Sequence, residues 1–564
     1  MAIVLLVSLP WLSRLMAADQ PSGNAAAKGT ITAHVFDQSK IFPGTTRKYW
    51  VYVPQQYDPA KPACVYIGQD GHHPKFTDIF DRLISSHQMP VTVGIFVAPG
   101  VVPAPVAKAA PRVNRSFEYN SLGDDYARFL LEELLPAVAR EQKLNLSTNG
   151  NDRCIGGGSS GASAAFTVAW ERPDAFRRVF GVSGAYPFAR GSCYSVLVRK
   201  TEAKPLRIYL HAGKQDMMNA SGDLWMDHEK LSRALAFAGY DCLSQSSEGR
   251  HMDQYTAVFP EAMIWLWKDW PAPVQAGSNP PRVQDILLEH EPWKVVAEGY
   301  RQVSGLAVNA QGETFFCDTA AKQIYKVGTD GKATLFLATA EPVSGLTTAA
   351  DGSLYGVSEA TGNVVALNSR GLSRTLARGI AGHALVATRD GGFYVTEPGP
   401  EGAAQSKVWY ISPKGEKKVV DTGLRGASGT TISPDGWLLY VADSRSHWVY
   451  SYQITAGGKL VNREHFHWLH VPDSADDSGA DGVAVSRNGI LYVGTRMGIQ
   501  TSDLQGHNQC ILPVPGGRVS ALAFGGADFD VLYAISGNKL YARKVKVHGS
   551  HVFQPPIKPA GGGL

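Results

Sequence analysis

The sequence has 564 residues, which is too many for one hydrophobic core, so we expect two or more domains. Hydrophobic residues make up 44% of the chain and charged residues 18%, and the formal net charge is +4. This composition is that of a globular protein, and the small net charge gives no reason to expect nucleic acid or a strongly acidic partner. The 59 glycines and 33 prolines favour a turn-rich, all-β portion.

The N-terminus predicts export. Residues 2–12 form an apolar stretch that is short for a membrane span, and Ala17 and Ala18 precede a polar segment, as at a signal-peptidase site. We therefore expect a signal peptide over residues 1–18 and a secreted or periplasmic protein. No Lys or Arg precedes the apolar stretch and Arg14 follows it, so a wrongly assigned start or a disordered tail is the alternative. No later segment predicts a transmembrane helix.

The cysteines show neither a CxxC pair nor the spacing of a metal site, so we expect each to be a buried small residue. They are Cys64, Cys154, Cys193, Cys242, Cys317 and Cys510. Export would allow one or two disulfides among the first four, but their pairing does not follow from the sequence.

Between residues 29 and 270, apolar strand-like runs alternate with helical patterns. We expect strands at residues 48–54, 64–68, 90–98, 153–157, 177–182 and 206–212, and helices at 122–142, 163–172, 223–239 and 260–267. This alternation predicts an α/β domain, with a mostly parallel sheet and helices on both faces. The stretch WPAPVQAGSNPP then indicates a linker, which we place at residues 271–284.

After the linker, one pattern recurs six times: a short apolar strand, a polar turn with glycine, and a second strand rich in aromatic residues. The copies begin at Val303, Val343, Gly382, Ala427, Ala480 and Val519. Their spacing of about 40 to 50 residues is the period of a four-stranded propeller blade. The sequence therefore predicts an all-β six-bladed propeller over residues 285–545, followed by a tail at residues 546–564.

A serine in a glycine-rich turn is the first candidate catalytic residue. The segment GSSGA at residues 158–162 follows a predicted strand and precedes a predicted helix. A nucleophile on such a sharp turn needs small neighbours, because the backbone there is strained and closely packed. We expect Ser160 to be the nucleophile, with Ala162 in place of the usual second glycine. A plain Gly/Ser loop is the alternative.

A serine hydroxyl needs a base, and the base needs an orienting carboxylate. In hydrolases with this strand–turn–helix element, the order along the chain is serine, acid, histidine. Asp216 follows a predicted strand and is the expected acid, with Asp223 as the alternative. His251 is the expected base. His228 lies in a charged helix and is expected to face solvent, whereas His211 lies in a strand and is expected to pack in the core.

The oxyanion of an ester-hydrolysis intermediate needs two preorganised donors. We expect one from the N–H of Gly161, directly after Ser160. The second is expected from the loop after the third strand, with Gly71 as the donor and Asp70 as a substrate contact. A plain surface turn is the alternative for this loop.

A wider pattern surrounds these residues: VYVP…QDG…RSFEYNSLGDDYARFLLEELLP…GSSGA…EGRH…WLWKDWP. It resembles the enterochelin-esterase-like (esterase D) α/β-hydrolases, a group that includes feruloyl and acetyl xylan esterases. The resemblance covers roughly residues 30–270 and implies the same triad. It also implies pocket or structural roles for Arg115, Glu118 and Tyr119, although Glu118 could equally be a buried ion-pair partner of Arg115.

The propeller segments SPDGWLLYVADSRSHWVYSY and ADGVAVSRNGILYVGTRMGIQ resemble the gluconolactonase/regucalcin-like propellers. Those enzymes bind a divalent cation at the top of the central channel through Glu, Asn, Asn and Asp, oxygen ligands that hard cations favour. In this sequence the four positions hold Ser304, His383, Ser428 and Asp481. This set is poor for Ca²⁺, although His383 and Asp481 could hold a softer ion such as Zn²⁺. A turn-capping role is the alternative for Asp481.

Together these features predict an exported serine carboxylic-ester hydrolase fused to a propeller, which deacylates carbohydrate esters of the feruloyl or acetyl type. The esterase chemistry requires no cofactor. The expected partner is a small-molecule or polysaccharide ester, without nucleic acid or a membrane span. Two alternatives concern the propeller, which is either a metal-dependent lactonase or a non-catalytic binding module.

Overall fold

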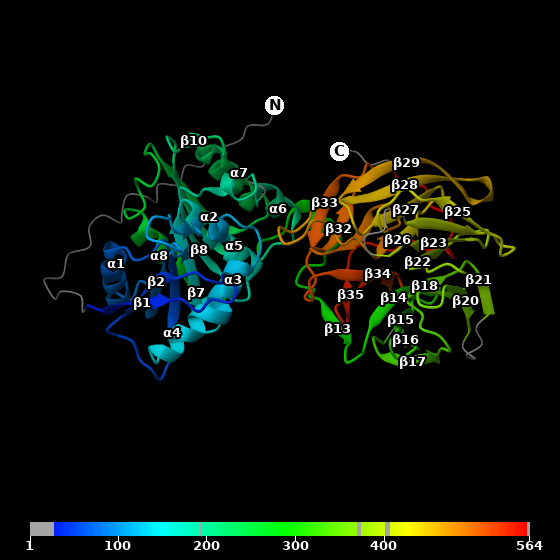
Figure 1. The fold of residues 1–564 in the computed structure, drawn as a ribbon, viewed down its shortest axis with the longest axis horizontal. Coiled ribbons are helices and arrows are strands. Elements are labelled where there is room, and N and C mark those ends of the chain that lie inside the picture. Colours follow the sequence, from blue (N-terminus) through cyan, green and yellow to red (C-terminus); the bar gives the residue numbers. More distant parts are fainter. Residues whose placement is uncertain (1–27, 192–193, 329, 369–373, 401–405, 561–564) are drawn as a thin grey trace, which may run out of the picture.

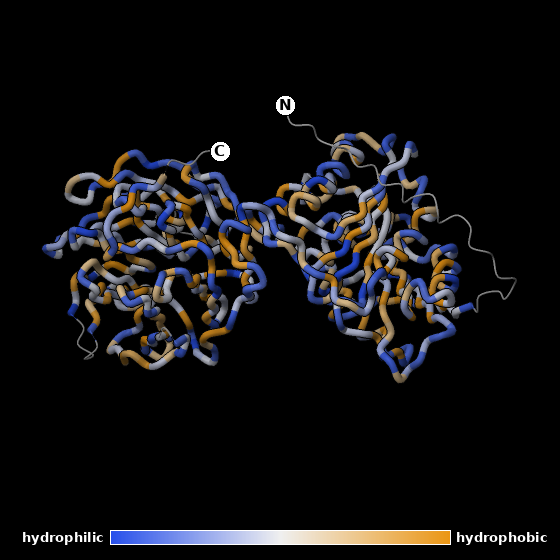
Figure 2. The backbone as a smooth tube through the Cα atoms, turned by 180° about the vertical axis from the view of Figure 1, so that it is seen from behind, coloured by the Kyte–Doolittle hydropathy of each residue, from blue (hydrophilic) through white to orange (hydrophobic). Residues whose placement is uncertain are grey.

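The computed structural model describes residues 28–191, 194–328, 330–368, 374–400 and 406–560, and the predicted signal peptide lies outside this part of the chain. The described residues form two bodies side by side, an α/β domain and a β-propeller (Figure 1). Seen from behind, the chain narrows to a waist between them, and hydrophobic segments run through the interior of the α/β domain (Figure 2). The predicted fold class is confirmed.

The α/β domain is built on an eight-stranded sheet with the order β1-β2-β4-β3-β7-β8-β9-β12. Its strands are β1 (Thr30–Phe36), β2 (Arg47–Val53), β3 (Cys64–Gln69), β4 (Thr92–Val97), β7 (Arg153–Gly158), β8 (Arg178–Val182), β9 (Arg207–Gly213) and β12 (Asp241–Ser247). Strand β2 runs antiparallel to both of its neighbours, and all other neighbours pair in parallel. Two small hairpins lie outside this sheet, β5 (Val101–Val102) with β6 (Arg112–Val113) and β10 (Met218–Asn219) with β11 (Gly222–Asp223).

Helices cover both faces of the sheet. Side chains alternate along β3, so Tyr66 packs with α1 (Pro74–Ser85) and α8 (Phe259–Trp267), while Val65 and Ile67 face the opposite side. That opposite side holds α5 (Ser160–Glu171) and α7 (Leu224–Phe237). The remaining short helices are α2 (Arg115–Tyr119), α3 (Asp125–Arg128), α4 (Leu135–Glu141), α6 (Tyr194–Lys200), η2 (Gly150–Asp152) and η3 (Tyr186–Phe188).

The helix expected at residues 122–142 is not a regular α-helix. Between α3 and α4 lies a π-helical turn, η1 (Phe129–Leu134). Pro136 follows this turn at the start of α4, and a proline has no N–H for the regular helical hydrogen bond. We attribute the local widening to this missing donor.

Six four-stranded sheets form the C-terminal domain, as the repeat predicts. Its strands, grouped by blade, are β14 (Val303–Val308), β15 (Thr314–Asp318), β16 (Gln323–Val327) and β17 (Ala333–Ala338); β18 (Gly345–Thr348), β19 (Leu354–Ser358), β20 (Asn363–Leu367) and β21 (Arg374–Arg378); β22 (Ala384–Ala387), β23 (Phe393–Glu397), β24 (Lys407–Ile411) and β25 (Lys417–Asp421); β26 (Ala427–Ile432), β27 (Leu438–Asp443), β28 (Trp448–Thr455) and β29 (Lys459–Trp468), with the turn η4 (Ala456–Gly458); β30 (Val483–Val485), β31 (Leu491–Thr495), β32 (Gly498–Ser502) and β33 (Asn508–Leu512); and β34 (Val519–Gly525), β35 (Val531–Ser536), β36 (Lys539–Lys544) and β13 (Lys294–Ala297).

The propeller is closed by pairing its two ends. Strand β13, the first of the domain, pairs with β36, the last, and becomes the outer strand of the sixth blade. The innermost strands contact one another in a ring that returns from β34 to β14. Each copy of the predicted repeat corresponds to the two inner strands of one blade.

The segment between the domains is held in place. The N–H of Val274 donates to Asn151 at 2.9 Å, and Asn279 accepts from the N–H of Ala203 at 2.7 Å. A short helix, α9 (Pro281–Ile286), begins inside the linker predicted at residues 271–284, extends two residues beyond it and buries two side chains in a hydrophobic cluster of the propeller.

The predicted C-terminal tail packs on the propeller. The N–H of Ser550 donates to the carbonyl of Val485, where β30 ends, and the N–H of Ile557 donates to the carbonyl of Pro434. Val552 and Phe553 line the central channel together with the inner strands. The tail therefore covers the end of the channel at which the inner strands finish.

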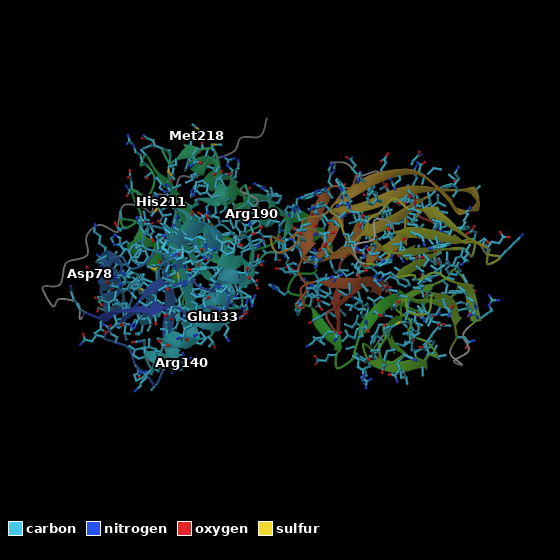
Figure 3. The ribbon with its side chains drawn as sticks, in the orientation of Figure 1. Asp78, Glu133, Arg140, Arg190, His211 and Met218 are labelled. Atoms are coloured by element: carbon cyan, nitrogen blue, oxygen red, sulfur yellow. The ribbon has the colours of Figure 1, made fainter. Side chains whose placement is uncertain are left out.

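The two domains also meet through polar contacts. Arg190, labelled in Figure 3 on the side of the α/β domain nearest the propeller, donates to both carboxylate oxygens of Asp473 at 2.5 and 3.0 Å. Arg543 of the propeller makes a similar pair with Glu202, with both distances at 2.8 Å. The N–H of Glu202 also donates to the carbonyl of Ile511 in β33. These contacts fix how the two domains lie against each other.

The described residues contain neither a candidate membrane-spanning helix nor a disulfide. In the described segments, no helix has the length and apolar character needed to cross a bilayer. The five cysteines that the structure describes are unpaired, and all but Cys242 are buried. Cys193 lies outside the described residues.

Candidate active site

Strand β7 passes into helix α5 through a strained residue, Ser159. Its backbone has φ 56° and ψ −128°, which a non-glycine residue adopts only where its surroundings enforce it. Its N–H donates to the carbonyl of Val182 at 3.0 Å, and its own carbonyl accepts from the N–H groups of Ala162 and Ala185. These bonds hold the turn at the carboxyl end of β7, which is where a nucleophile elbow lies.

The glycines two residues before and after Ser159 have no room for a side chain. A Cβ on Gly157 would lie 2.6 Å from the carbonyl carbon of Gly161, and a Cβ on Gly161 would lie 2.9 Å from Oδ2 of Asp70. Neither distance is possible without movement of the neighbouring atoms. Residues 157–161 therefore form the Gly-x-Ser-x-Gly pattern, one position earlier than the segment used to predict Ser160.

Ser160 begins α5 and is only 2% exposed. This burial argues against the prediction of Ser160 as nucleophile, because a nucleophile must reach its substrate. The residue after the nucleophile normally provides an oxyanion donor, so the first expected donor moves from Gly161 to Ser160. The signal for Ser159 is present in the sequence, since only the earlier five-residue segment has glycine at both ends.

Asp216 and His251 lie together as predicted. Nδ1 of His251 is 2.6 Å from Oδ1 of Asp216, whose side chain is fully buried, while the imidazole is 23% exposed. Burial opposes ionisation of the carboxyl group, but hydrogen bonds from His251 and from the N–H of Met217 outweigh it and lower the pKa of Asp216. The ionised carboxylate holds a proton on Nδ1 and leaves Nε2 of His251 free to accept one.

The histidine loop packs against the serine turn. A Cβ on Gly158 would collide with the side chain of Met252, so the residue before Ser159 contacts the residue after His251. The N–H of Met252 also donates to Oγ of Ser183, in the loop after β8, at 3.1 Å. The serine, acid and histidine loops therefore meet at the carboxyl edge of the sheet.

The other candidates have structural positions. Asp223 caps α7 by accepting from the N–H of Met226 at 3.0 Å. His228 does not face solvent as predicted, because its side of α7 packs on the sheet; it is 2% exposed and lies 3.0 Å from Oγ of Ser244. Burial lowers the pKa of His228 to about 4, so it is neutral. His211 is buried in β9, in agreement with its expected packing.

The loop after β3 differs from its predicted role. Asp70 and Gly71 both have positive φ, of 63° and 89°, which turns the chain back on itself. As a result, the N–H of Gly71 donates to the carbonyl of Val97 at 3.1 Å. Gly71 was expected to supply the second oxyanion donor, but its N–H is engaged by the neighbouring strand.

The predicted substrate contacts divide into two groups. Arg115 pairs with Asp70 through two hydrogen bonds, at 2.6 and 2.9 Å, and both side chains are about one-third exposed. Glu118 pairs not with Arg115 but with Arg47, at 2.9 and 3.0 Å, with both side chains fully buried. Tyr119 is also fully buried, with its hydroxyl 3.3 Å from the N–H of Asp70. Asp70 and Arg115 are therefore accessible beside the serine turn, whereas Glu118 and Tyr119 support the fold.

The propeller contains a cavity of about 820 Å³ in its central channel, lined by the innermost strands of all six blades. At one end, Nε2 of His383 lies 2.7 Å from Oδ1 of Asp481, and Nδ1 lies 4.0 Å from Glu359. The negative charge of Asp481, aided by Glu359, raises the pKa of His383 to about 10 although burial opposes it. The pair is therefore an imidazolium–carboxylate ion pair at neutral pH.

The channel residues do not fit a divalent cation. Asp481 is the only carboxylate among the four positions, and its two oxygens already face His383 and Arg518. The hydroxyl of Ser304 is hydrogen-bonded to Thr319 at 2.5 Å, and that of Ser428 donates to the carbonyl of Ala480 at 2.7 Å. Among the described residues, no group of three or more His, Cys, Asp or Glu side chains has a metal-binding arrangement. The positions predicted from the resemblance thus already have protein partners: His383 and Asp481 bond to each other, Ser304 to the Thr319 hydroxyl and Ser428 to a backbone carbonyl.

Two family models match the chain. Residues 39–266 match the family described as "Putative esterase", and residues 303–538 match the SMP-30/gluconolactonase/LRE-like region. Lactonase drp35 of Staphylococcus haemolyticus is 25% identical over 186 residues, which cover 30% of this chain and 57% of that protein. The match therefore spans little more than half the length of this curated relative.

Solved structures resemble each half of the chain. A gluconolactonase from Xanthomonas campestris is 21% identical over 47% of this chain and 93% of that chain, with a TM-score of 0.42. The enterobactin esterase of Shigella flexneri is 16% identical over 42% of this chain and 59% of that chain, with a TM-score of 0.32. A ferulic acid esterase is 16% identical over 43% of this chain and 98% of that chain, with a TM-score of 0.34.

Proposed function

Because residues 39–266 form an esterase-family domain and residues 303–538 an SMP-30/gluconolactonase-like domain, we propose that this protein is a serine carboxylic-ester hydrolase with Ser159 as its nucleophile. The observation that carries the proposal is the strained turn at Ser159 beside the hydrogen-bonded pair of Asp216 and His251. Backbone strain of this kind clusters at active sites, where the surrounding structure compensates for it.

In the proposed reaction, Oγ of Ser159 attacks the ester carbonyl while Nε2 of His251 takes the hydroxyl proton, and Asp216 stabilises the imidazolium that forms. The oxyanion forms at the N-terminus of α5, where the N–H groups of Ser160 and Gly161 have no intrahelical acceptor and the helix dipole is favourable. His251 then protonates the leaving alcohol as its C–O bond breaks, which leaves an acyl-serine. A water molecule deprotonated by His251 attacks this intermediate, releases the acid and restores Ser159.

Two neighbouring alanine variants test this assignment with p-nitrophenyl butyrate. Ser159→Ala is expected to lower kcat by about 10⁴-fold or more, because the nucleophile is lost. Ser160→Ala is the matched control: it removes the adjacent hydroxyl, keeps the backbone N–H and is expected to retain most of the activity. Wild-type turnover by Ser159→Ala, or loss of activity in Ser160→Ala alone, would contradict the proposal.

The proposed substrate is an esterified carbohydrate of the feruloyl or acetyl type, and the proposed location is outside the cytoplasm. The dense resemblance of residues 30–270 to a group that includes carbohydrate esterases supports the substrate, and the apolar segment at residues 2–12 supports export. A sugar ester is expected to give a higher kcat/KM than the p-nitrophenyl ester of the same acid. N-terminal sequencing of protein recovered from the culture medium or periplasm is expected to begin at residue 19.

A second candidate function is lactone hydrolysis in the propeller. The gluconolactonase-like match and the channel cavity of about 820 Å³ favour it, whereas the donor set around His383 and Asp481 opposes a metal-dependent reaction. Turnover of an aldonolactone by Ser159→Ala in the presence of Zn²⁺ or Ca²⁺, abolished by EDTA, would establish this function. The esterase activity is expected to be unaffected by EDTA. A propeller that binds ligand without turnover is the third possibility, and retention of residues 282–564 on polysaccharide in a pull-down, without aldonolactone turnover, would distinguish it.

A further inference from the structure

A smaller cavity, of about 210 Å³, lies where the two domains meet. Its walls come from α2 and the residues after it, from Arg190, and from Asp473 and Ser474 of the propeller. Besides its pair with Arg190, the Asp473 carboxylate accepts from Oγ of Ser121 at 3.2 Å and from the N–H of Leu122 at 3.3 Å. The propeller therefore supplies one wall of a pocket in the esterase domain.

Aromatic side chains form the apolar part of this junction pocket. Phe42 and Tyr126 are buried, but Phe117 is 70% exposed. Phe117 meets Phe42 edge to face with the ring centroids 6.1 Å apart, which leaves most of the Phe117 ring in solvent. A large apolar ring exposed beside a cavity is available to pack on the apolar face of a ligand.

The charges around the junction pocket are already paired. The pairs that include its lining residues are Glu118 with Arg47, Asp473 with Arg190, and Asp125 with Arg128. No charged group among the described lining residues is therefore left to select an ion. Hydrogen-bonding capacity remains on Asn120, which lines the pocket. A side-chain amide can both donate to and accept from ligand hydroxyls.

The junction pocket is connected to the serine turn. The hydroxyl of Tyr126 donates a hydrogen bond to the side-chain oxygen of Gln69 at 2.5 Å. Gln69 in turn packs closely on Gly161, because a Cβ on Gly161 would lie only 2.9 Å from the Cβ of Gln69. From the other side, Arg115 at the start of α2 pairs with Asp70 of the same loop. A group held in the pocket would contact Tyr126, whose hydroxyl is bonded to Gln69 beside the serine turn.

We propose that the junction pocket binds one sugar ring of the ester substrate, with the apolar face of the ring on Phe117 and its hydroxyls on Asn120 and Asp473. The inference rests on the proposed esterase function and specifies its substrate. A pyranose is uncharged, has an apolar C–H face and carries a rim of hydroxyls, which are the three properties that this pocket selects. Its volume of about 210 Å³ is below the roughly 300–1,000 Å³ of sites for drug-sized ligands and suits a single ring.

The test measures binding of methyl β-glucopyranoside and methyl β-xylopyranoside to the full-length Ser159→Ala variant by isothermal titration calorimetry. This background keeps sugar binding separate from hydrolysis. Saturable binding of at least one glycoside is expected, weakened about tenfold or more by adding Phe117→Ala, Asn120→Ala or Asp473→Ala. Cyclohexylmethanol has a similar ring without the rim of hydroxyls and is expected not to bind.

One further variant serves as a matched control. Phe237→Ala removes an exposed aromatic ring of α7 that does not line the pocket. It is expected to bind the glycosides as the Ser159→Ala parent does. Failure of both glycosides to bind saturably, or unchanged affinity in Phe117→Ala and Asp473→Ala, overturns the inference. If Ser159→Ala keeps esterase activity, the proposed function fails, while the binding result still stands on its own.

Discussion

At the scale of single residues, Ser159 shows how the backbone prepares a site before any ligand arrives. A non-glycine residue in this strained conformation costs about 1–3 kcal/mol. Hydrogen bonds to Val182, Ala162 and Ala185 hold it there. Gly157 and Gly161 have no side chains, which lets the two ends of the turn and the loop after β3 pack closely together. The serine side chain is therefore fixed by the fold, which lowers the cost of bringing it to the ester carbonyl.

Asp216 provides a prediction at this scale. Asp216→Asn keeps the shape of the side chain but no longer favours the Nδ1–H tautomer of His251, so kcat is expected to fall about 10⁴-fold. Asp223→Asn is the control, because asparagine also caps helices well and α7 should be unaffected. Steady-state kinetics on p-nitrophenyl butyrate measure both variants. Equal loss in the two would mean that Asp216 is not the orienting acid.

Part of this site follows from the sequence and part does not. The chain order of serine, acid and histidine, each after a strand, leads to Asp216 and His251. Which of two adjacent serines adopts the strained φ depends on close contacts with other loops. Whether the Gly71 N–H is free depends on the neighbouring strand β4, and the partner of Glu118 lies far away in the sequence, at Arg47. These outcomes are set by tertiary contacts that a local pattern does not contain.

Among the strands of the α/β domain, the buried ones are predicted from the sequence and the exposed or polar ones are not. The inner parallel strands are buried along their whole length, and their predicted ends agree with the structure within two residues. The two edge strands, β1 and β12, lack such runs and were not predicted; most of β1 is exposed, and β12 is mainly polar. The propeller blades were predicted from repetition rather than from the pattern of any one strand.

The buried pair of Arg47 and Glu118 joins two elements, β2 and α2. Glu118→Gln leaves the guanidinium of Arg47 buried without its counter-charge, so the free energy of unfolding is expected to fall by about 3–5 kcal/mol. Glu132→Gln breaks the solvent-exposed pair with Arg128 and is expected to cause no measurable change. Urea unfolding followed by circular dichroism compares the two variants. Equal stability of Glu118→Gln and wild type would show that this pair does not hold α2 in place.

His383 predicts a pH dependence for the propeller. Its pKa is raised to about 10, mainly by Asp481, from an unfolded value of about 6.5. A raised pKa means that the folded state binds the proton more tightly, so this stabilisation is complete below pH 6.5 and is lost as the pH rises towards 10. Between these values, the melting temperature of the propeller is expected to fall more steeply in wild type than in His383→Gln. Parallel curves for the two proteins would contradict the ion pair with Asp481.

In the whole molecule, the propeller is joined to the α/β domain by side-chain contacts as well as by the linker. Its Asp473 and Arg543 form ion pairs with the esterase domain, and the linker packs on that domain. The length predicts two or more domains, and the repeat predicts the propeller. The contacts between them were not predicted, because they involve single polar residues in loops and at strand ends.

The pair of Glu202 and Arg543 tests this coupling. The Arg543 side chain is 6% exposed, so Glu202→Ala leaves its charge nearly buried and without a partner. Such a change typically lowers stability by about 2–5 kcal/mol. Differential scanning calorimetry is expected to show a lower melting temperature and a wider separation of the two domain transitions. Glu298→Ala removes the exposed partner of Lys539 and should leave the thermogram unchanged. Identical thermograms for Glu202→Ala and wild type would mean that the domains unfold independently.

Covalent labelling identifies the nucleophile without relying on turnover. A fluorophosphonate reacts with an activated serine and remains attached, so mass spectrometry of the peptide that contains residues 153–172 locates the adduct. We expect one adduct, on Ser159, absent from Ser159→Ala and His251→Ala and retained in Ser160→Ala. An adduct on Ser160, or none on this peptide, would mean that Ser159 is not the nucleophile.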